Sequence, residues 1–372
     1  MMFRSKFGLT LAALFVLIGA PAPSPAQEAP FRIGVAGLVH GHVGGFFNQA
    51  LKRPDVQIVG IAEPDRALFD RYAARYKLNA NLYYPSLDAL LKAAHPDGIV
   101  LYTSTFGHRA AVETCSRNHM PVMMEKPLAV SYQDALAMAD AARTGHIHVL
   151  VNYETTWYAS NRQLKDLLNE GQLGELHKMV FRDGHQGPRE IHVQPEFFQW
   201  LTDPKLNGAG ALFDFGCYGA DIGTWLMNGQ EPVSVTAVTR RIKPSIYPRV
   251  DDEADVIVAY PKAIAILQGS WNWPYAIKDG VVYGTTASAQ TILRDKVSIQ
   301  REHQTAPDIR DSKPLEAPED DNLHLFAAIV RNRIPDNDNS LSGLKTNLIV
   351  SEILDAARQS AETGRTIQLP LK

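Results

Sequence analysis

Short apolar runs alternate with longer amphipathic stretches through the first 150 residues of the chain, beginning at Phe31. We expect buried strands at 31–37, 56–62, 98–102, 121–124 and 148–153, and helices at 44–53, 64–76, 86–94, 109–118 and 131–144. Strands and helices that alternate at this spacing are typical of a parallel, doubly wound sheet. The pattern therefore predicts an α/β domain over residues 31–151.

The alternation of strand and helix patterns ends at about residue 152. A helical pattern at 160–169 precedes strand-like segments at 176–182, 233–241, 254–260, 263–271, 281–284 and 296–301. Several of these segments are joined by proline or glycine turns, which favours an antiparallel sheet. Residues 304–320 are polar and are expected to form a loop, and two helices are expected at 322–333 and 344–363. We therefore expect a second, α+β domain over residues 152–372 with a large, mostly antiparallel sheet.

The first residues have the pattern of a cleavable export signal. Arg4 and Lys6 precede an apolar run from Leu9 to Ile18, and Ser24-Pro25-Ala26 supplies small residues for cleavage. The run is shorter than the roughly 20 residues that span a bilayer. We therefore expect residues 1–26 to be removed and the protein to be exported, periplasmic or secreted, with no membrane association afterwards. An uncleaved anchor remains the alternative.

Composition and charge narrow the function classes. The chain has 372 residues, with 45% hydrophobic and 21% charged content, which is ordinary for a globular protein. Removing Arg4 and Lys6 from the 37 basic residues leaves 35 against 40 acidic ones, so neither a nucleic acid nor an anionic membrane is an expected partner. Cys115 and Cys217 are interpreted as buried free thiols.

Twelve histidines raise the question of a metal site. The pairs His40/His42 and His146/His148 have no cysteine or carboxylate beside them at ligand spacing. The sequence therefore predicts no metal ion.

A glycine-containing turn follows the first predicted strand, where a dinucleotide fold holds a pyrophosphate. The usual G-x-G-x-x-G would place glycines at 37, 39 and 42, whereas this chain has Gly37, Val39 and His42. Gly37, His40, Gly41 and His42 are candidate contacts to the phosphates or the nicotinamide. A plain tight turn is the alternative.

Glu63 ends the second predicted strand, 26 residues after Gly37. An acidic side chain there accepts hydrogen bonds from ribose hydroxyls and repels a 2′-phosphate, which slightly favours NAD over NADP. Asp65 competes for this role, and Arg66 keeps NADP open. A helix-capping cluster is the alternative interpretation.

Lys126 stands at the carboxyl end of the predicted strand 121–124, within the run Met124-Glu125-Lys126-Pro127-Leu128-Ala129. Ligands of open α/β sheets bind beyond that edge, so we expect Lys126 to face the site. Burial or a neighbouring positive charge lowers the pKa of a lysine, which suits acid–base chemistry. A salt-bridged surface lysine is the alternative.

Together these motifs resemble the oxidoreductase family of glucose–fructose oxidoreductase, inositol dehydrogenase and MocA. The resemblance is carried by the glycine turn, 58–65, 103–108, Glu125-Lys126-Pro127-Leu128, 208–218 and 250–254. It implies a Rossmann domain for a nicotinamide dinucleotide, with Thr103, Ser104, His108 and Glu125 beside the cofactor. It also implies that Lys126 orients substrate and relays protons, that the Lys126–Pro127 peptide is cis, and that the protein is a homo-oligomer formed through an exposed sheet face.

The chain departs from this family's usual pattern at one position. Many members have a histidine four residues after the aspartate, whereas this chain has Tyr218. Asp214, Tyr218 and Asp221 would share one face of a helix. Asp214 is expected to hold substrate hydroxyls and Tyr218 to exchange the proton; a helix cap and a core aromatic are the alternatives. His185, in a glycine-rich loop, is a candidate second proton relay, or a loop histidine bonded to backbone.

These residues lead to the expectation of an exported NAD(P)-dependent oxidoreductase that acts on a secondary alcohol of a sugar or polyol. Free dinucleotide is scarce outside the cytoplasm, so the cofactor is expected to stay tightly bound and to be regenerated within the cycle. We further expect a cationic nicotinamide to depress the pKa of Lys126, which in turn lowers that of Tyr218. Two alternatives remain open: a redox-neutral glycosidase acting through a keto-sugar, and a non-catalytic carbohydrate-binding protein on a degenerate dinucleotide fold.

Overall fold

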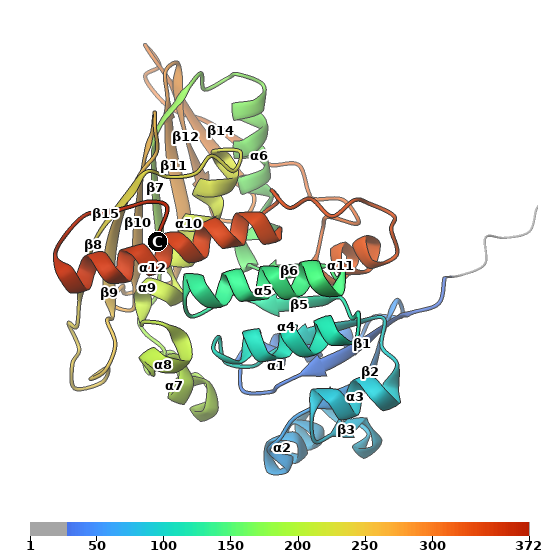
Figure 1. Ribbon diagram of the computed structural model, residues 1–372. Helices are drawn as coiled ribbons and strands as arrows, with labels where there is room; N and C mark the ends of the chain where they lie inside the picture. The colour runs from blue at the N-terminus through green and yellow to red at the C-terminus, as the bar shows by residue number, and fades with distance from the viewer. Residues whose placement is uncertain (1–27, 372) are drawn as a thin grey trace, which may run out of the picture.

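The computed structural model of the protein describes residues 28–371, so the expected export signal lies outside the described residues. Figure 1 shows two layered halves, a parallel sheet flanked by helices and a larger sheet beside it. Six parallel strands form the first sheet in the order β3-β2-β1-β4-β5-β6. Their bounds are β1 Phe31–Ala36, β2 Val56–Ala62, β3 Tyr83–Tyr84, β4 Gly98–Leu101, β5 Val122–Glu125 and β6 Val149–Asn152. This confirms the expected doubly wound fold.

Helices connect these strands and cover both faces of the sheet. They are α1 Val43–Ala50, α2 Arg66–Tyr76, α3 Leu87–Ala94, α4 Gly107–Arg117 and α5 Tyr132–Gly145, with a short 3-10 turn at Ala80–Leu82. Strands β4 and β5 are buried along their whole length, as expected for strands covered on both sides. Side-chain caps fix several helix starts: Asp65 accepts from the amides of Ala67 and Leu68, and Ser131 accepts from that of Asp134.

Nine strands form the second sheet, in the order β14-β13-β12-β11-β7-β10-β9-β8-β15. Among the strand pairs of this sheet within residues 28–371, only β7–β10 is parallel. The bounds are β7 Leu176–Gly184, β8 Ser234–Arg240, β9 Glu253–Ala259, β10 Ile264–Ser270, β11 Ile277–Gly284, β12 Ala287–Ile292, β13 Lys296–Arg301, β14 Asp308–Asp311 and β15 Ile367–Gln368. The mostly antiparallel sheet predicted for the second domain is confirmed.

One face of the second sheet is packed and the other is open. In β9, buried positions alternate with exposed ones, and the exposed Ile257 lies between two buried valines. Helix α10 (Gly216–Leu226) packs against β7 and β10, and α12 (Leu344–Thr363) packs against α10 and β8. The remaining helices of this half are α6 Ala159–Asn169, α7 Pro195–Leu201, α8 Pro204–Asn207 and α9 Ala211–Asp214, with a 3-10 turn at Glu154–Trp157.

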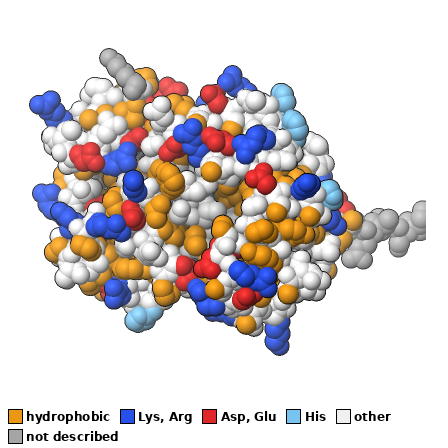
Figure 2. All heavy atoms as spheres, turned by 60° about the horizontal axis from the view of Figure 1, so that its bottom comes forward, with side chains coloured by type: hydrophobic (Ala, Val, Ile, Leu, Met, Phe, Trp, Pro, Cys, Tyr) orange, Lys and Arg blue, Asp and Glu red, His pale blue; other side chains and the backbone are white. Residues whose placement is uncertain are grey.

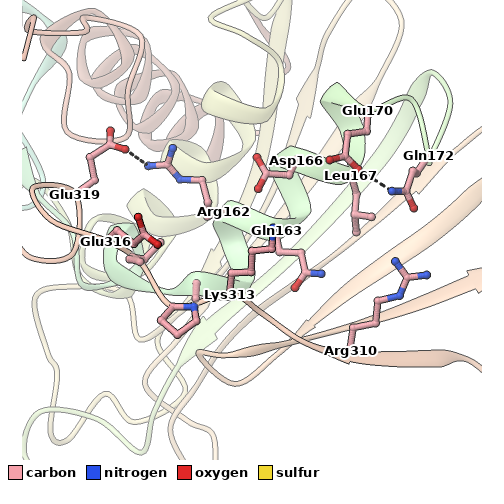
Figure 3. A pocket seen from close by; sticks show the side chains of 13 residues that line it. Arg162, Gln163, Asp166, Leu167, Glu170, Gln172, Arg310, Lys313, Glu316 and Glu319 are labelled. Atoms are coloured by element: carbon pink, nitrogen blue, oxygen red, sulfur yellow. Dashed lines mark hydrogen bonds and ion pairs between the residues drawn. The ribbon is translucent and has the colours of Figure 1, made fainter. Parts of the chain in front are cut away.

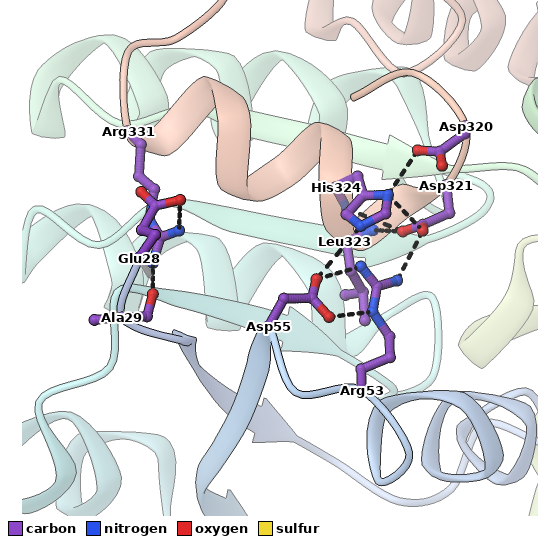
Figure 4. A network of polar contacts seen from close by, with 9 residues as sticks. All are labelled: Glu28, Ala29, Arg53, Asp55, Asp320, Asp321, Leu323, His324 and Arg331. Atoms are coloured by element: carbon purple, nitrogen blue, oxygen red, sulfur yellow. Dashed lines mark hydrogen bonds and ion pairs between the residues drawn. The ribbon is translucent and has the colours of Figure 1, made fainter. Parts of the chain in front are cut away.

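The last part of the chain returns to the first sheet. Helix α12 runs beside α5, and α11 (Asn322–Val330) sets Phe326 against Phe31, with ring centroids 5.5 Å apart. Asp321 caps α11 and accepts a hydrogen bond of 2.7 Å from Arg53, which also binds Asp55 (Figure 4). Residues from both ends of the sequence therefore build the first core.

Some short elements were not predicted. The segment 304–320, expected to be a loop, contains strand β14, which pairs with β13. Strands β3, β12 and β15 and helices α7 to α9 were also missed, because they are short or carry mixed polar side chains with no clear period. Cys115 and Cys217 are buried free thiols, as predicted. No helix within 28–371 has the length and apolar character needed to cross a bilayer.

Candidate active site

The carboxyl ends of β1, β2, β4 and β5 meet along one edge of the parallel sheet. The turn after β1 is tight: Gly37 has φ +83°, and a Cβ there would lie 2.7 Å from Thr103 Cγ2 and 2.9 Å from the carbonyl oxygen of Tyr102. Helix α1 begins directly after this turn; the amide of Val43 donates to the carbonyl oxygen of His40 at 3.1 Å, and the amides that follow it lie at the open N-terminus of the helix. The turn therefore offers the backbone geometry that receives a phosphate.

The buried carboxylate of Glu63 binds two backbone amides, one in the turn after β1 and one just after β2. One oxygen accepts from the amide of Leu38 at 2.8 Å and the other from the amide of Asp65 at 3.0 Å. Asp65 itself caps α2, so it is engaged as a helix cap. Each oxygen of Glu63 keeps a lone pair for a further donor, which leaves the predicted ribose contact possible.

Thr103 and Ser104 lie half-buried after β4, where the dinucleotide was expected. His108 is different: it is fully buried in α4, and its Nδ1 lies 3.1 Å from the carbonyl oxygen of Leu128. Within the described residues its Nε2 has no partner. His108 thus holds the turn after Lys126, and its predicted contact with a cofactor stays a prediction.

Lys126 is buried rather than exposed to water. Its Nζ donates to Asp214 Oδ1 at 2.6 Å and to the Asp214 carbonyl oxygen at 2.9 Å. Trp271 Nε1 donates to the other carboxylate oxygen at 2.9 Å. The Lys126–Pro127 peptide is cis, as the resemblance implied. The predicted lysine and aspartate are therefore in direct contact across the two domains.

Asp214 and Tyr218 do not share a helix, contrary to the prediction. Helix α9 ends at Asp214, Phe215 separates the two helices with φ −113°, and α10 begins at Gly216. The side chains still converge, because the ring centroid of Tyr218 is 5.1 Å from Lys126 Nζ. Asp221 lies in the core of α10, and neither of its carboxylate oxygens has a partner in the described part of the chain.

The electrostatics differ from the expectation in one respect. Burial lowers the pKa of Lys126, but the opposing effects of its neighbours, above all the Asp214 carboxylate, together outweigh burial, so the pKa is raised. Burial raises the pKa of Tyr218 well above its usual value. The expectation that Lys126, beside a cationic nicotinamide, lowers the pKa of Tyr218 stays a prediction. The Lys126–Asp214 pair is an ion pair in a nearly dry site.

A cavity of about 500 Å³ is lined by His185 and by Phe215, the residue that follows Asp214. The Nδ1 of His185 accepts from the amide of Gly187 at 2.9 Å, so a neutral ring carries its proton on Nε2. Burial lowers the pKa of His185, which favours this neutral form.

The same cavity contains charged residues that the sequence did not single out as candidates. Glu154 forms ion pairs with Lys278 and Arg294, and Lys278 Nζ lies 4.6 Å from the centroid of Tyr218. Lys278 and Arg294 come from strand β11 and the turn after β12, so no local motif identifies them. They give the cavity charged groups that can form hydrogen bonds.

His40 and His42 lie on the turn after β1 and contact different residues. His42 Nδ1 is 2.9 Å from Glu125 Oε2, which connects the turn to the end of β5. His40 is buried against Phe197 and Trp200 of α7, with ring centroids 4.8 and 5.3 Å away. Trp200 Nε1 donates to the carbonyl oxygen of Val39 at 3.0 Å.

Helix α7 therefore covers the turn from the side of the second domain. A Cβ on Gly41 would lie 2.6 Å from Phe197 and 2.8 Å from the side chain of Gln194. Figure 2 shows the molecule turned so that the bottom of Figure 1, where α7 lies, comes forward; acidic and basic side chains are interspersed over this face.

A second cavity, of about 300 Å³, lies between α6 and residues 310–319 (Figure 3). Arg162, Gln163, Asp166, Arg310 and Lys313 are among its lining residues. None of the predicted site residues borders it. The chemistry expected from the sequence therefore belongs to the crevice at Lys126.

Both halves of the chain match models of known protein families. Residues 31–153 match the family described as "Oxidoreductase family, NAD-binding Rossmann fold", and residues 161–290 match the "GFO/IDH/MocA C-terminal domain". The rhizopine catabolism protein MocA of Rhizobium meliloti is 26% identical over 219 residues, which are 57% of this chain and 61% of that protein. The chain spans about three fifths of the length of the first curated relatives that it matches.

Solved structures share the fold over nearly the full chain. The aldose–aldose oxidoreductase of Caulobacter crescentus, complexed with glycerol, has a TM-score of 0.76 and 20% identity and covers 91% of this chain and 100% of its own. An inositol dehydrogenase homologue of Azotobacter vinelandii, complexed with NAD+, has a TM-score of 0.77 and 17% identity and covers 93% of this chain and 99% of its own. At these identities the likeness shows the fold.

Proposed function

This chain belongs to the Gfo/Idh/MocA family of oxidoreductases, and on that premise we propose that it transfers a hydride between a secondary alcohol of a sugar or polyol and a nicotinamide dinucleotide. One observation carries the proposal: Lys126, at the carboxyl end of a Rossmann strand, binds Asp214, and the next residue, Phe215, lines a cavity together with His185. A positioned acid–base pair beside a polar cavity is what hydride transfer from an alcohol requires.

The residues of the crevice fit a dinucleotide. Gly37 has no room for a side chain, α1 presents its N-terminus, and the carboxylate of Glu63 stands at the end of β2. When bound, a nicotinamide supplies the hydride acceptor. We favour NAD over NADP, since Glu63 would repel a 2′-phosphate.

The protein's own residues would hold the alcohol and move its proton. Two hydrogens of the Lys126 ammonium go to Asp214, so the third is available for a substrate oxygen. Neutral His185 donates from Nε2 and orients a second oxygen. Lys126 would release its proton more readily beside a cationic nicotinamide, which opposes the effect of Asp214. Tyr218, against the same ammonium, is the remaining candidate for proton exchange.

We also propose that the protein is exported and retains its cofactor. The cover that α7 forms over Val39, His40 and Gly41 supports slow release, because a dinucleotide on the turn would be in contact with it. A retained cofactor must be reduced and reoxidised in one cycle, and we propose that the protein does so by oxidising one sugar and reducing another. A structural neighbour named aldose–aldose oxidoreductase agrees with that scheme.

The same cover favours the second candidate, a carbohydrate-binding protein that has lost its cofactor. If α7 cannot move, Phe197 blocks the approach to Gly41. A homo-oligomer formed through the open face of the second sheet is compatible with either function, since an apolar face exposed to water favours a partner.

The enzyme proposal is tested by Lys126→Ala. Purified protein is screened with aldoses and polyols for the absorbance of reduced nicotinamide, with and without added dinucleotide. We expect the variant to lose hydride transfer by a factor of about 100 or more, as for other acid–base groups. Lys313→Ala, in the separate cavity of Figure 3, is the control and keeps full activity. Near-normal turnover by Lys126→Ala would remove the proposed role, and no hydride transfer by the unaltered protein would favour the binding protein.

A further inference from the structure

Three potential metal ligands meet in the crevice although they are distant in sequence. His40 and His42 come from the turn after β1, and Glu125 is the last residue of β5. One ligand atom of each lies within 4.8 Å of the others. The sequence argued against a metal because no carboxylate accompanies the histidine pair at ligand spacing. The fold supplies that carboxylate from 83 residues away.

The distances suit a small divalent ion. Zinc binds histidine nitrogen and carboxylate oxygen at about 2.0–2.2 Å, so two ligands at a tetrahedral angle are about 3.3–3.5 Å apart. Here His42 Nδ1 and Glu125 Oε2 are 2.9 Å apart, and the rings of His40 and His42 have centroids 4.7 Å apart. The His42–Glu125 pair would open by a few tenths of an ångström to reach this spacing, and the ligand atom of His40 lies within 4.8 Å of both.

The surroundings hold these ligands in place. Asn152 Nδ2 donates to Glu125 Oε1 at 3.1 Å, and Trp157 Nε1 donates to Asn152 Oδ1 at 3.0 Å. Such outer partners orient metal-binding carboxylates. His40 is packed between aromatic rings at 1% exposure, whereas the side chain of His42 is 45% exposed. The site is thus fixed on one side and accessible on the other.

The positive charge of Lys126, next to these three ligands, does not prevent a cation from binding to them. Lys126 follows Glu125 in the chain, but its ammonium is neutralised by Asp214 at 2.6 Å. In residues 28–371 the only other group of this kind is Asp320, Asp321 and His324. There Asp321 caps α11 and pairs with Arg53, so its oxygens already have partners (Figure 4).

We propose that His40, His42 and Glu125 bind a divalent transition-metal ion of the zinc type, with three protein ligands and an open position towards the crevice. Two histidines and a glutamate with a free fourth position form a ligand set found in catalytic zinc sites. Binding replaces the direct contact between His42 and Glu125 and releases any proton they share. The proposal does not rest on the dinucleotide, because the ligands all belong to the chain.

Metal content of the tag-free, full-length protein tests the proposal directly. The protein is stripped with a chelator, incubated with zinc, passed through a desalting column and analysed by plasma mass spectrometry. We expect about one zinc per chain, as the ligand set forms one site. His42→Gln and Glu125→Gln, which keep side-chain size, should lose it. His303→Gln, at a residue whose side chain is 88% exposed and far from the cluster in sequence, is the matched control and should retain it.

Cobalt substitution gives a second readout that a folding defect does not imitate. Co²⁺ at a site with nitrogen and oxygen ligands shows visible absorption that reports its coordination, and His42→Gln should abolish it while circular dichroism stays unchanged. Unaltered protein that retains no zinc, or His42→Gln and Glu125→Gln proteins that retain as much as the unaltered chain, would overturn the assignment. Zinc retention lost in His303→Gln to the same extent would overturn it as well.

Discussion

The buried pair of Lys126 and Asp214 allows a quantitative test of how the site is held together. Their side chains are 5% and 8% exposed, with Nζ and Oδ1 2.6 Å apart. Asp214→Asn keeps the shape of the side chain but leaves the ammonium of Lys126 without a counter-charge. Removing one partner of a buried pair costs about 3–5 kcal/mol, so we expect the free energy of unfolding at pH 7 to fall by that amount.

A double-mutant cycle separates this charge effect from general damage. Lys126→Met combined with Asp214→Asn removes both charges, and the double variant should be more stable than Asp214→Asn alone. Asp140→Asn is the control, because Asp140 and Arg143 form an exposed pair worth about 1 kcal/mol or less. Guanidinium unfolding followed by tryptophan fluorescence gives the free energies. A loss below about 1 kcal/mol for Asp214→Asn, or a double variant as unstable as the sum of the singles, would refute the reasoning.

The same pair sets a pH dependence with opposite signs at the two ends. The pKa of Asp214 is lowered in the folded protein, so its contribution is complete above the unfolded value of about 3.9 and is lost as the pH falls through the folded value. The pKa of Lys126 is raised, so its contribution is complete below about 10.4 and is lost as the pH rises through the folded value. Stability from this pair should therefore be constant between about pH 5 and 9.

Three further substitutions test other parts of the structure. Glu63→Gln should weaken NAD binding by about tenfold and reduce the preference over NADP, measured by calorimetry with each dinucleotide, since a charged acceptor is lost; equal loss for both would contradict the 2′-phosphate argument. Gly37→Ala should destabilise the protein by about 2–4 kcal/mol, because φ is +83° and the new Cβ would clash with Thr103. Gly171→Ala, with φ +72° and open space, isolates the backbone part; similar losses in both would exclude the clash. Ile257→Lys on the open sheet face should lower the mass seen by light scattering, whereas Leu51→Lys, at a residue that is also 47% exposed, should not.

The sequence predicted the first sheet well because its strands are apolar along their length and recur with helices between them. Strand β12 was missed, since Ser288 and Gln290 alternate with small residues on a half-exposed surface. Spacing suggested one helix through Asp214 and Tyr218, but the backbone breaks at Phe215. The periodicity of the local sequence cannot show such a break, because tertiary packing determines where a helix is interrupted.

The sequence predicted individual residues of the candidate site, but not which of them contact one another. Lys126 and Asp214 stood out through local motifs, yet their contact spans 88 residues. Trp271 donates to the second oxygen of the Asp214 carboxylate, and no pattern in the sequence pairs these two residues. Lys278 and Arg294 had no motif at all. Pairing across domains depends on how the two sheets dock, which no single segment encodes.

The position of this pair also affects how activity data should be interpreted. Lys126 directly follows strand β5 of the first sheet, whereas Asp214 and Trp271 belong to the second half, so the same bonds position the proton donor and join the domains. A variant that loses activity could therefore have lost domain docking alone. Lys126→Arg distinguishes the two: it keeps a cation for Asp214 but cannot give up its proton. If it restores the unfolding free energy lost in Lys126→Ala while hydride transfer stays absent, the proton of Lys126, and not only its charge, takes part in the reaction.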